Sequence, residues 1–186
     1  DSHNQFRTIP TADGGNMQCT GKHTSINNAT FNEDVALQND IQLSSSNVTL
    51  LVNVAMQTHD LTLAGVDGTV SGVISGSGSL ISNLVDDLNL DGENTYTGST
   101  LINDGDLNLS SAPSDNNISG SSDVYLALNS SLIPRTGNSF DLVNGQTLSG
   151  EGAVADNLFA LDGSIIRPGT SPGVFNFDLL NFNTGS

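Results

Sequence analysis

The sequence predicts an all-β protein, and within that class a single-stranded, right-handed parallel β-helix, or β-solenoid, of roughly eight coils. Short apolar alternations such as Leu88/Leu90 and Leu107/Leu109 are separated by Gly, Asn, Asp, Ser and Thr, with no helical period. A short unit also recurs along the chain. Hydrophobic residues make up 35% of the 186 residues, which is low for a globular core but enough for the thin apolar stripe of a solenoid coil.

The recurring unit is an Asp, an aliphatic residue, any residue and a Leu. The last five of its starts are 20, 27, 19 and 17 residues apart, a mean of about 21, and such a period is typical of repeat arrays. Units this short leave no room for a helix, so stacked parallel strands are favoured, with an antiparallel β-sandwich as the alternative. The unit occupies Asp34–Leu37, Asp40–Leu43, Asp60–Leu63, Asp87–Leu90, Asp106–Leu109 and Asp123–Leu126.

Alternate aliphatic side chains of these strands are expected to point into the solenoid. Gly and Asn are expected at the corners, where φ is positive, and Ser and Thr at like positions are expected to form hydrogen-bonded ladders. Residues 110–121 are predicted to form a protruding loop. The predicted inward residues are Val48, Leu50, Leu61, Leu63, Val70, Val73, Leu80, Leu88, Leu90, Ile102, Leu107, Leu109, Val124 and Leu126.

The chain divides into an N-terminal segment, 1–24, and a solenoid domain, 25–186. The segment has no alternating pattern, and it holds two of the four bases, two of the three His and the single Cys. We predict that it is a tail that caps the first coil or packs against a neighbouring molecule. Because the chain begins at Asp1 and not at Met, a removed signal peptide or a fragment boundary is expected.

Two stretches carry motifs with a known counterpart. Leu88 and Leu90 precede Asn94-Thr95-Tyr96-Thr97-Gly98, which is followed by Thr100, Ile102, Gly105, Leu107 and Leu109; later come Leu148-Ser-Gly-Glu-Gly-Ala-Val154 and Pro168-Gly-Thr-Ser-Pro-Gly173. These motifs resemble the passenger-associated repeat of bacterial autotransporters, over residues 72–109 and 146–177. The resemblance implies a β-helical protein that is extracellular or held at a bacterial cell surface.

The net charge is −16, from 20 acids and 4 bases. So few bases cannot neutralise phosphates, which argues against nucleic acid and anionic membranes as partners. The thin spread of the acids favours a solvated surface, with calcium as the cation that it would attract; no other cofactor is predicted. One cysteine cannot form a disulfide within the chain, and no apolar run is long enough for membrane insertion.

Catalytic signatures are weak. His3, His23 and His59 lie in different polar settings without a GxSxG elbow, which argues against a Ser/His/Asp triad, and with one Cys they supply no zinc cluster. Candidate acid pairs for carbohydrate chemistry are Asp86-Asp87 and Asp104/Asp106, with Arg135 and Arg167 as the bases of the solenoid body. Asp106 begins a repeat unit, so a structural role explains it better.

We therefore predict a non-enzymatic structural or adhesive protein of the cell surface or biofilm matrix that self-associates head-to-tail into fibres. Glycans or cell surfaces are further expected partners. The alternative is a carbohydrate-binding or polysaccharide-degrading β-helix protein. The predicted assembly interface joins the N-terminal segment to the Phe-rich C-terminal segment, through Phe6, Ile9, Cys19, Phe175, Phe177, Leu179, Leu180 and Phe182.

Overall fold

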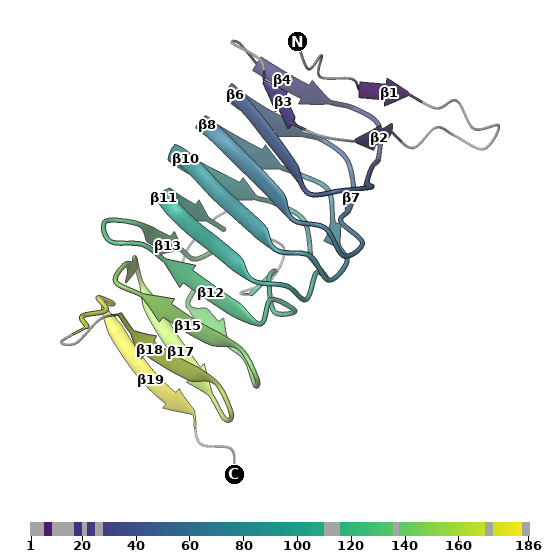
Figure 1. The fold of residues 1–186 in the computed structure, drawn as a ribbon. Helices are drawn as coiled ribbons and strands as arrows, with labels where there is room; N and C mark the ends of the chain where they lie inside the picture. Colours follow the sequence, from purple (N-terminus) through teal and green to yellow (C-terminus); the bar gives the residue numbers. More distant parts are fainter. Residues whose placement is uncertain are drawn as a thin grey trace.

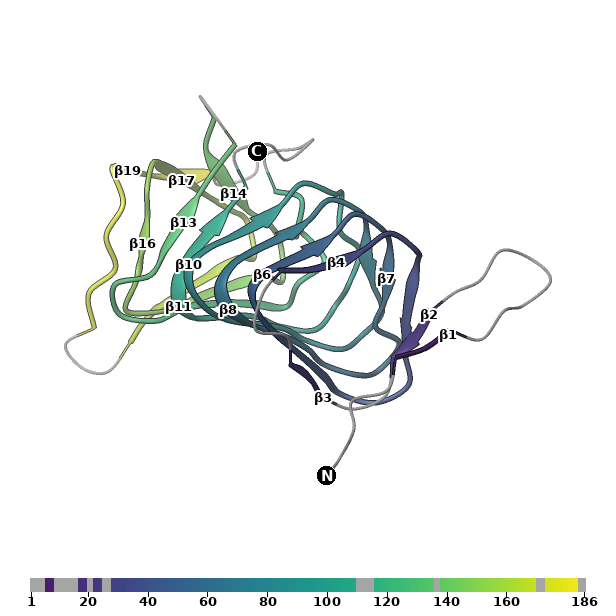
Figure 2. The same cartoon turned by 90° about the horizontal axis from the view of Figure 1, so that it is seen from above.

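The chain folds into a parallel β-solenoid of about seven turns, close to the predicted number (Figure 1). The computed structural model describes residues 6–8, 17–19, 22–24, 28–109, 116–135, 138–169 and 173–183, with the backbone alone for 6–8, 17–19, 22–24 and 183. Seen along the stack, the coils overlie one another around one interior (Figure 2). Among the described strands only β1 and β2 pair antiparallel, so the parallel β-helix is confirmed and the antiparallel sandwich is wrong.

The strands form three sheets. The five-stranded sheet has the order β1 (Phe6–Thr8), β2 (Met17–Cys19), β5 (Val35–Leu37), β7 (Val54–Ala55) and β9 (Ile74–Ser75). The three-stranded sheet has the order β14 (Phe140–Leu142), β17 (Asn157–Leu161) and β19 (Leu179–Asn183). The eleven-stranded sheet contains β3 (Lys22–Thr24), β4 (Asn28–Phe31), β6 (Ile41–Leu50), β8 (Leu61–Val70), β10 (Leu80–Leu90), β11 (Thr100–Asn108), β12 (Asp123–Leu126), β13 (Ser131–Ile133), β15 (Thr147–Gly150), β16 (Ala153–Val154) and β18 (Ile165–Pro168).

The parallel register stacks like side chains in columns along the axis. One buried column runs through β6, β8, β10, β11, β12 and β15, and it ends at the half-buried Ile166 of β18. Because inward side chains of successive coils touch, this column forms a continuous core from only one residue per coil. Its members are Ile41, Leu61, Leu80, Thr100, Val124, Leu148 and Ile166.

The predicted inward residues are buried, with one exception. Val73 is only half-buried, and its neighbour Ile74 is the inward residue, with no exposed surface. Val73 lies in the corner before β9, where its N–H donates to Asn53 Oδ1 at 3.0 Å, and Ile74 pairs with Val54. A shift of one residue at this corner reverses which side chain faces the core, so the prediction of Val73 was wrong.

The recurring Asp of the repeat unit has a structural role. Asp34 Oδ1 accepts the backbone N–H of Asn53 at 2.9 Å, and Asp40 Oδ1 accepts that of Asp60 at 3.0 Å. Asp60 Oδ1 in turn accepts the N–H of Ser79 at 2.8 Å. Each carboxylate therefore satisfies a corner donor in the following coil, which explains why the unit begins with Asp.

Asn and Gly complete the corners. Asn47 Nδ2 donates to Asn28 Oδ1 at 2.9 Å, and Asn103 Nδ2 donates to Asn83 Oδ1 at 2.9 Å, so Asn forms polar ladders as well, beside a Ser/Thr hydrogen bond of the expected kind between Thr100 Oγ1 and Ser121 Oγ at 2.9 Å. A Cβ added to Gly98 would overlap the carbonyl oxygen of Gly78 in the coil below. This close backbone approach requires glycine at the corner.

The predicted loop at 110–121 is packed inward in its second half. Asn117 Nδ2 donates to the carbonyl oxygens of Leu90 and Gly92 at 2.9 and 2.8 Å, and Ile118 is fully buried. For residues 116–121 the prediction of a protruding loop was therefore wrong, because the Asn side chain replaces strand hydrogen bonds at the corner. The described residues contain no helix long and apolar enough to cross a membrane.

The Asp ladder gives a first testable prediction. Asp60→Ala removes the acceptor of the Ser79 N–H, so the free energy of unfolding should fall by about 1.5–3 kcal/mol, the usual contribution of a hydrogen bond to a charged group. Denaturant unfolding followed by circular dichroism measures the change. Asp162→Ala, at an exposed carboxylate, is the control and should change it by less than about 0.5 kcal/mol; equal losses would contradict the structural role of the ladder.

Candidate functional site: the open C-terminal coil

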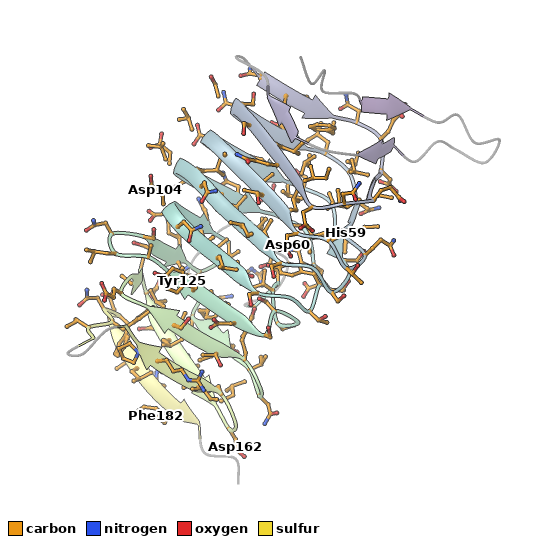
Figure 3. All side chains as sticks on the ribbon, viewed as in Figure 1. His59, Asp60, Asp104, Tyr125, Asp162 and Phe182 are labelled. Atoms are coloured by element: carbon orange, nitrogen blue, oxygen red, sulfur yellow. The ribbon has the colours of Figure 1, made fainter. Side chains whose placement is uncertain are left out.

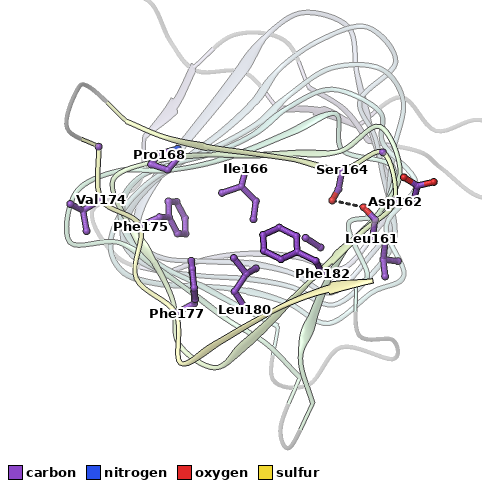
Figure 4. Close-up of a pocket in the computed structure, with 13 residues that line it drawn as sticks. Leu161, Asp162, Ser164, Ile166, Pro168, Val174, Phe175, Phe177, Leu180 and Phe182 are labelled. Atoms are coloured by element: carbon purple, nitrogen blue, oxygen red, sulfur yellow. Dashed lines mark hydrogen bonds between the residues drawn. The ribbon is translucent and has the colours of Figure 1, made fainter. Parts of the chain in front are cut away.

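The last coil ends the stack without a described segment above it. It is built from β18, the segment around Asn176, which forms a single parallel bridge to Ala153, and β19, and it stacks on β15, β16 and β17. Figure 4 looks into this coil and shows Phe175, Phe177 and Phe182 with Ile166 pointing toward its middle. In the rest of the solenoid, the inward side chains of a coil are covered by the next coil. In the last coil they face an opening.

The opening is a cavity of about 690 Å³. Its lining is mostly apolar and aromatic, with Asp162 and Ser164 as polar groups at one side, where Ser164 Oγ donates to the carbonyl oxygen of Leu161 at 2.7 Å. The volume is in the range of sites that bind small molecules or protein side chains. The lining residues are Ala160, Leu161, Asp162, Gly163, Ser164, Ile166, Pro168, Gly173, Val174, Phe175, Phe177, Leu180 and Phe182.

Large apolar side chains at this end remain in solvent. Phe182 is 70% exposed, Val174 60% and Leu179 52%. In the interior coils, the inward leucines such as Leu63 and Leu88 are fully buried. A cluster of exposed apolar side chains on a chain that is otherwise acidic is typical of an interaction surface.

The structure brings most residues of the predicted C-terminal interface together around one cavity. Phe175, Phe177, Leu180 and Phe182 all line the cavity, and Leu179 is exposed beside it. The sequence analysis missed Ile166 and Pro168, which come from β18 on the opposite side of the coil. The adjacent aliphatic pair Ile165-Ile166 just before Pro168 was the available signal.

The predicted N-terminal half of the interface lies elsewhere. Phe6 and Cys19 are paired in register between β1 and β2, at the opposite end of the stack from β19 (Figure 1). Their side chains, like residue Ile9 as a whole, lie outside the described part of the chain. The two halves can therefore meet only between different molecules.

A second feature is a hollow of about 470 Å³ on the flank, lined by five Asp side chains. It lies where the register of β10 against β11 shifts between Ser82 and Asn83 and again between Asn83 and Asp87, and such an irregularity bends a strand locally. Both predicted acid pairs meet here. The lining consists of Asp67, Val85, Asp86, Asp87, Asp104, Gly105, Asp106 and Asn129.

The carboxylates of the hollow have mostly structural contacts. Asp106 Oδ1 accepts the N–H of Ser131 at 2.7 Å, and Asp67 Oδ1 accepts that of Asp87 at 3.4 Å. Arg135 and Arg167 are not part of the lining. Among the described residues, no three His, Cys, Asp or Glu side chains are placed to hold one metal ion. The lining of the hollow therefore gathers negative charge and includes no Arg, Lys or His.

His59 and Tyr96 complete the residues singled out by sequence. His59 Nδ1 lies 3.7 Å from Asp40 Oδ1 on the flank, where Asp40 is 76% exposed, so this surface pair contributes little (Figure 3). Tyr96 of the NTYTG motif is buried, and its hydroxyl shares a 2.5 Å hydrogen bond with Thr100 Oγ1, which contacts Ser121 Oγ at 2.9 Å. Burial raises the pKa of Tyr96 well above its ordinary value, and the hydrogen bonds to Thr100 and Ser121 only partly oppose this.

Comparison with protein-family models, with curated proteins and with solved structures found no match. The functional argument therefore depends on the residues and contacts of this chain.

Tyr96 gives a prediction for alkaline stability. Because the pKa of Tyr96 is raised in the folded state, its contribution is complete below pH 10 and is lost as the pH rises further, by about 1.4 kcal/mol per pH unit. Tyr96→Phe should lower the free energy of unfolding by about 1 kcal/mol at pH 7 and reduce its decline above pH 10. Tyr125→Phe, at a half-buried flank position, is the control; parallel pH profiles for wild type and Tyr96→Phe would refute the assignment.

The acidic hollow gives a prediction for salt dependence. Asp86 faces four other carboxylates, so Asp86→Asn should raise the free energy of unfolding by about 0.2–0.5 kcal/mol at low ionic strength. The gain should disappear near 1 M NaCl, where the charges are screened. Urea unfolding at two salt concentrations tests this, with Asp162→Asn, outside the hollow, as the matched control. A gain that is independent of salt would show that repulsion is not its cause.

Proposed function

We propose that this chain is a non-catalytic structural or adhesive solenoid of the cell surface or extracellular matrix, and that it self-associates through its C-terminal coil. The observation that carries the proposal is the open apolar coil around Phe175, Phe177 and Phe182. Its cavity and the exposed side chains of Val174, Leu179 and Phe182 lie beside strand edges that lack a described neighbour. Unpaired strand edges beside apolar side chains favour association with another chain.

Three sequence properties support the extracellular part of the proposal. The chain contains a single Cys and no internal disulfide, its net charge of −16 keeps separate molecules apart in solution, and its repeat resembles that of surface passengers. A stack of coils in which each coil contacts only its neighbours gives an extended shape that suits a spacer or scaffold.

The roles of the acids support a non-catalytic assignment. Asp106, one member of a candidate pair, is engaged by the backbone N–H of Ser131, as the repeat requires. The chemistry considered for such pairs needs a basic proton acceptor or a carboxyl group with a raised pKa next to the substrate. The lining of the hollow supplies carboxylates and one amide, from Asn129.

Carbohydrate binding at the hollow is the second candidate, because the fold brings Asp86, Asp87, Asp104 and Asp106 into one hollow. Binding of a polysaccharide to a glycan array, with and without calcium, would favour it. Loss of that binding in Asp87→Asn, but not in Asp162→Asn, would assign it to the hollow.

Electron microscopy of the purified chain tests the main proposal. We expect assemblies that are linear multiples of one solenoid in length, formed with or without calcium. If the assembly is head-to-tail, deletion of residues 1–24 abolishes it; if it uses the C-terminal coil alone, the deletion leaves it intact. Dispersed single solenoids at every concentration up to about 1 mM would overturn self-association, since that limit corresponds to only about 4 kcal/mol of binding.

A further inference from the structure

The C-terminal coil can be assigned a partner surface on a second copy of this chain. This inference rests on the proposed self-association and asks which part of the second copy the coil meets. Charge limits the choice. Residues 161–183 contain Asp162, Asp178 and Arg167, a net charge of −1 (one base against two acids), whereas the whole chain carries −16. Residues 1–24 carry no net charge (Arg7 and Lys22 against Asp1 and Asp13), so copies repel along their flanks and approach more easily at either end of the stack than side by side.

The strand edges at the two ends differ in how they are protected. Edge strands commonly avoid pairing by means of charges or proline. Three of the four bases lie in edge strands, with Arg7 in β1, Lys22 in β3 and Arg167 in β18. In β18, Ile165 N–H donates to Gln146 O and Gly169 N–H donates to Gly150 O, so the backbone N–H groups of these two residues point toward the preceding coil. The backbone groups of Ile166 and Pro168 point the other way, toward the open edge of the sheet, and there Pro168 has no N–H to offer.

The strand β19 lacks such protection. Its sequence, LLNFN, contains neither charge nor proline, and Leu179 and Phe182 on it are 52% and 70% exposed. It pairs with β17 along five register positions and is the outer strand of the three-stranded sheet. At the other end, β4 is also uncharged, but its exposed side chains, Asn28 and Thr30, are polar. β19 therefore offers both free backbone groups and apolar contact.

The register argues against continuing the solenoid head-to-tail. One register column connects Lys22 of the first coil with Arg167 of the last, and an in-register junction would place these two cationic residues at adjoining positions about 4.8 Å apart. Like charges at adjoining positions of a sheet are destabilising. The column consists of Lys22, Gln42, Thr62, Ile81, Leu101, Tyr125, Ser149 and Arg167.

We propose that β19 pairs with β19 of a second copy about a two-fold axis. A strand that pairs with its own copy in this way is antiparallel, and the junction would join two three-stranded sheets into one of six strands. The two open coils then face each other, and the exposed Phe182 ring of one copy enters the cavity of the other. The result is a closed dimer, twice the length of one solenoid, with both N-terminal ends outward.

The mass and length of the full chain in solution test this. We expect multi-angle light scattering and small-angle X-ray scattering to show a dimer of doubled length that does not grow further with concentration. Phe182→Lys should raise the dissociation constant about 30-fold or more, as for a central interface residue, and Leu179→Lys should act in the same direction. Leu128→Lys, at a flank position that is 66% exposed, is the matched control and should leave the dimer unchanged.

A mixing experiment separates the two-fold junction from a head-to-tail junction. Fluorescently labelled Phe182→Lys is added to unlabelled wild type and sedimented. In a two-fold junction the label stays monomeric, because the substituted strand would have to face the partner strand directly. In a head-to-tail junction the intact N-terminal end of the variant binds wild-type C-terminal coils, and the label sediments with wild type. That second result would overturn this inference and leave the proposed function standing; wild type that is monomeric throughout would overturn both.

Discussion

The hydrogen bonding of each coil to the next is the interaction on which the rest of this structure depends. The strands of each coil are hydrogen-bonded to the next coil: Leu61 N–H donates to Ser79 O at 2.9 Å, and Leu80 N–H donates to Ser99 O at 2.9 Å, each one coil further along. The side chains follow the same rule, because Asp40 and Asp60 accept donors of the following coil. The columns of aliphatic residues, the Asp side chains at the corners and Gly98 all follow from one arrangement, in which equivalent positions of successive coils lie over one another.

A stack that satisfies each coil with the next must leave its last coil unsatisfied. At the N-terminal end the chain reverses, and β1 covers the edge of β2 in antiparallel pairing. At the C-terminal end β18 is protected by Pro168 and Arg167, but β19 and the cavity beside it are not. The interaction surface therefore does not interrupt the repeat; it is the inside of a coil that has no successor among the described residues.

The sequence was sufficient for the fold because the repeat itself encodes the columns. A period of about 20 residues and strict alternation at Leu88/Leu90 or Leu107/Leu109 identify the inward-facing residues from the sequence alone. Val73 was misassigned because two adjacent aliphatic residues at a corner leave the phase open, and only the hydrogen bond from its N–H to Asn53 Oδ1 decides it. Asn117 was misassigned because a polar side chain that bonds to the backbone of a neighbouring coil resembles a loop residue in sequence.

The candidate sites were less accessible to sequence reasoning. The Phe residues of the C-terminal segment were recognisable by composition, but Ile166 and Pro168 join them only because the coil closes. Likewise, Asp67 lies 37 residues before Asp104, and they line one hollow only because two coils and a register shift bring them together. Nothing in the local sequence at either residue indicates that the other is near.

The same stacking that builds the core also accumulates charge on the flank. Asp87 and Asp106 are register partners, and Asp87 N–H donates to Asp67, so that three repeats place their acids side by side. An aliphatic column gains contact with each added coil, whereas a carboxylate column gains repulsion. This repulsion lowers the free energy of unfolding, but the negative charge of the flank also keeps solenoids from associating side by side. Growth by lateral packing is thus disfavoured by the repeat itself, and contact at the less charged ends of the stack is favoured over it.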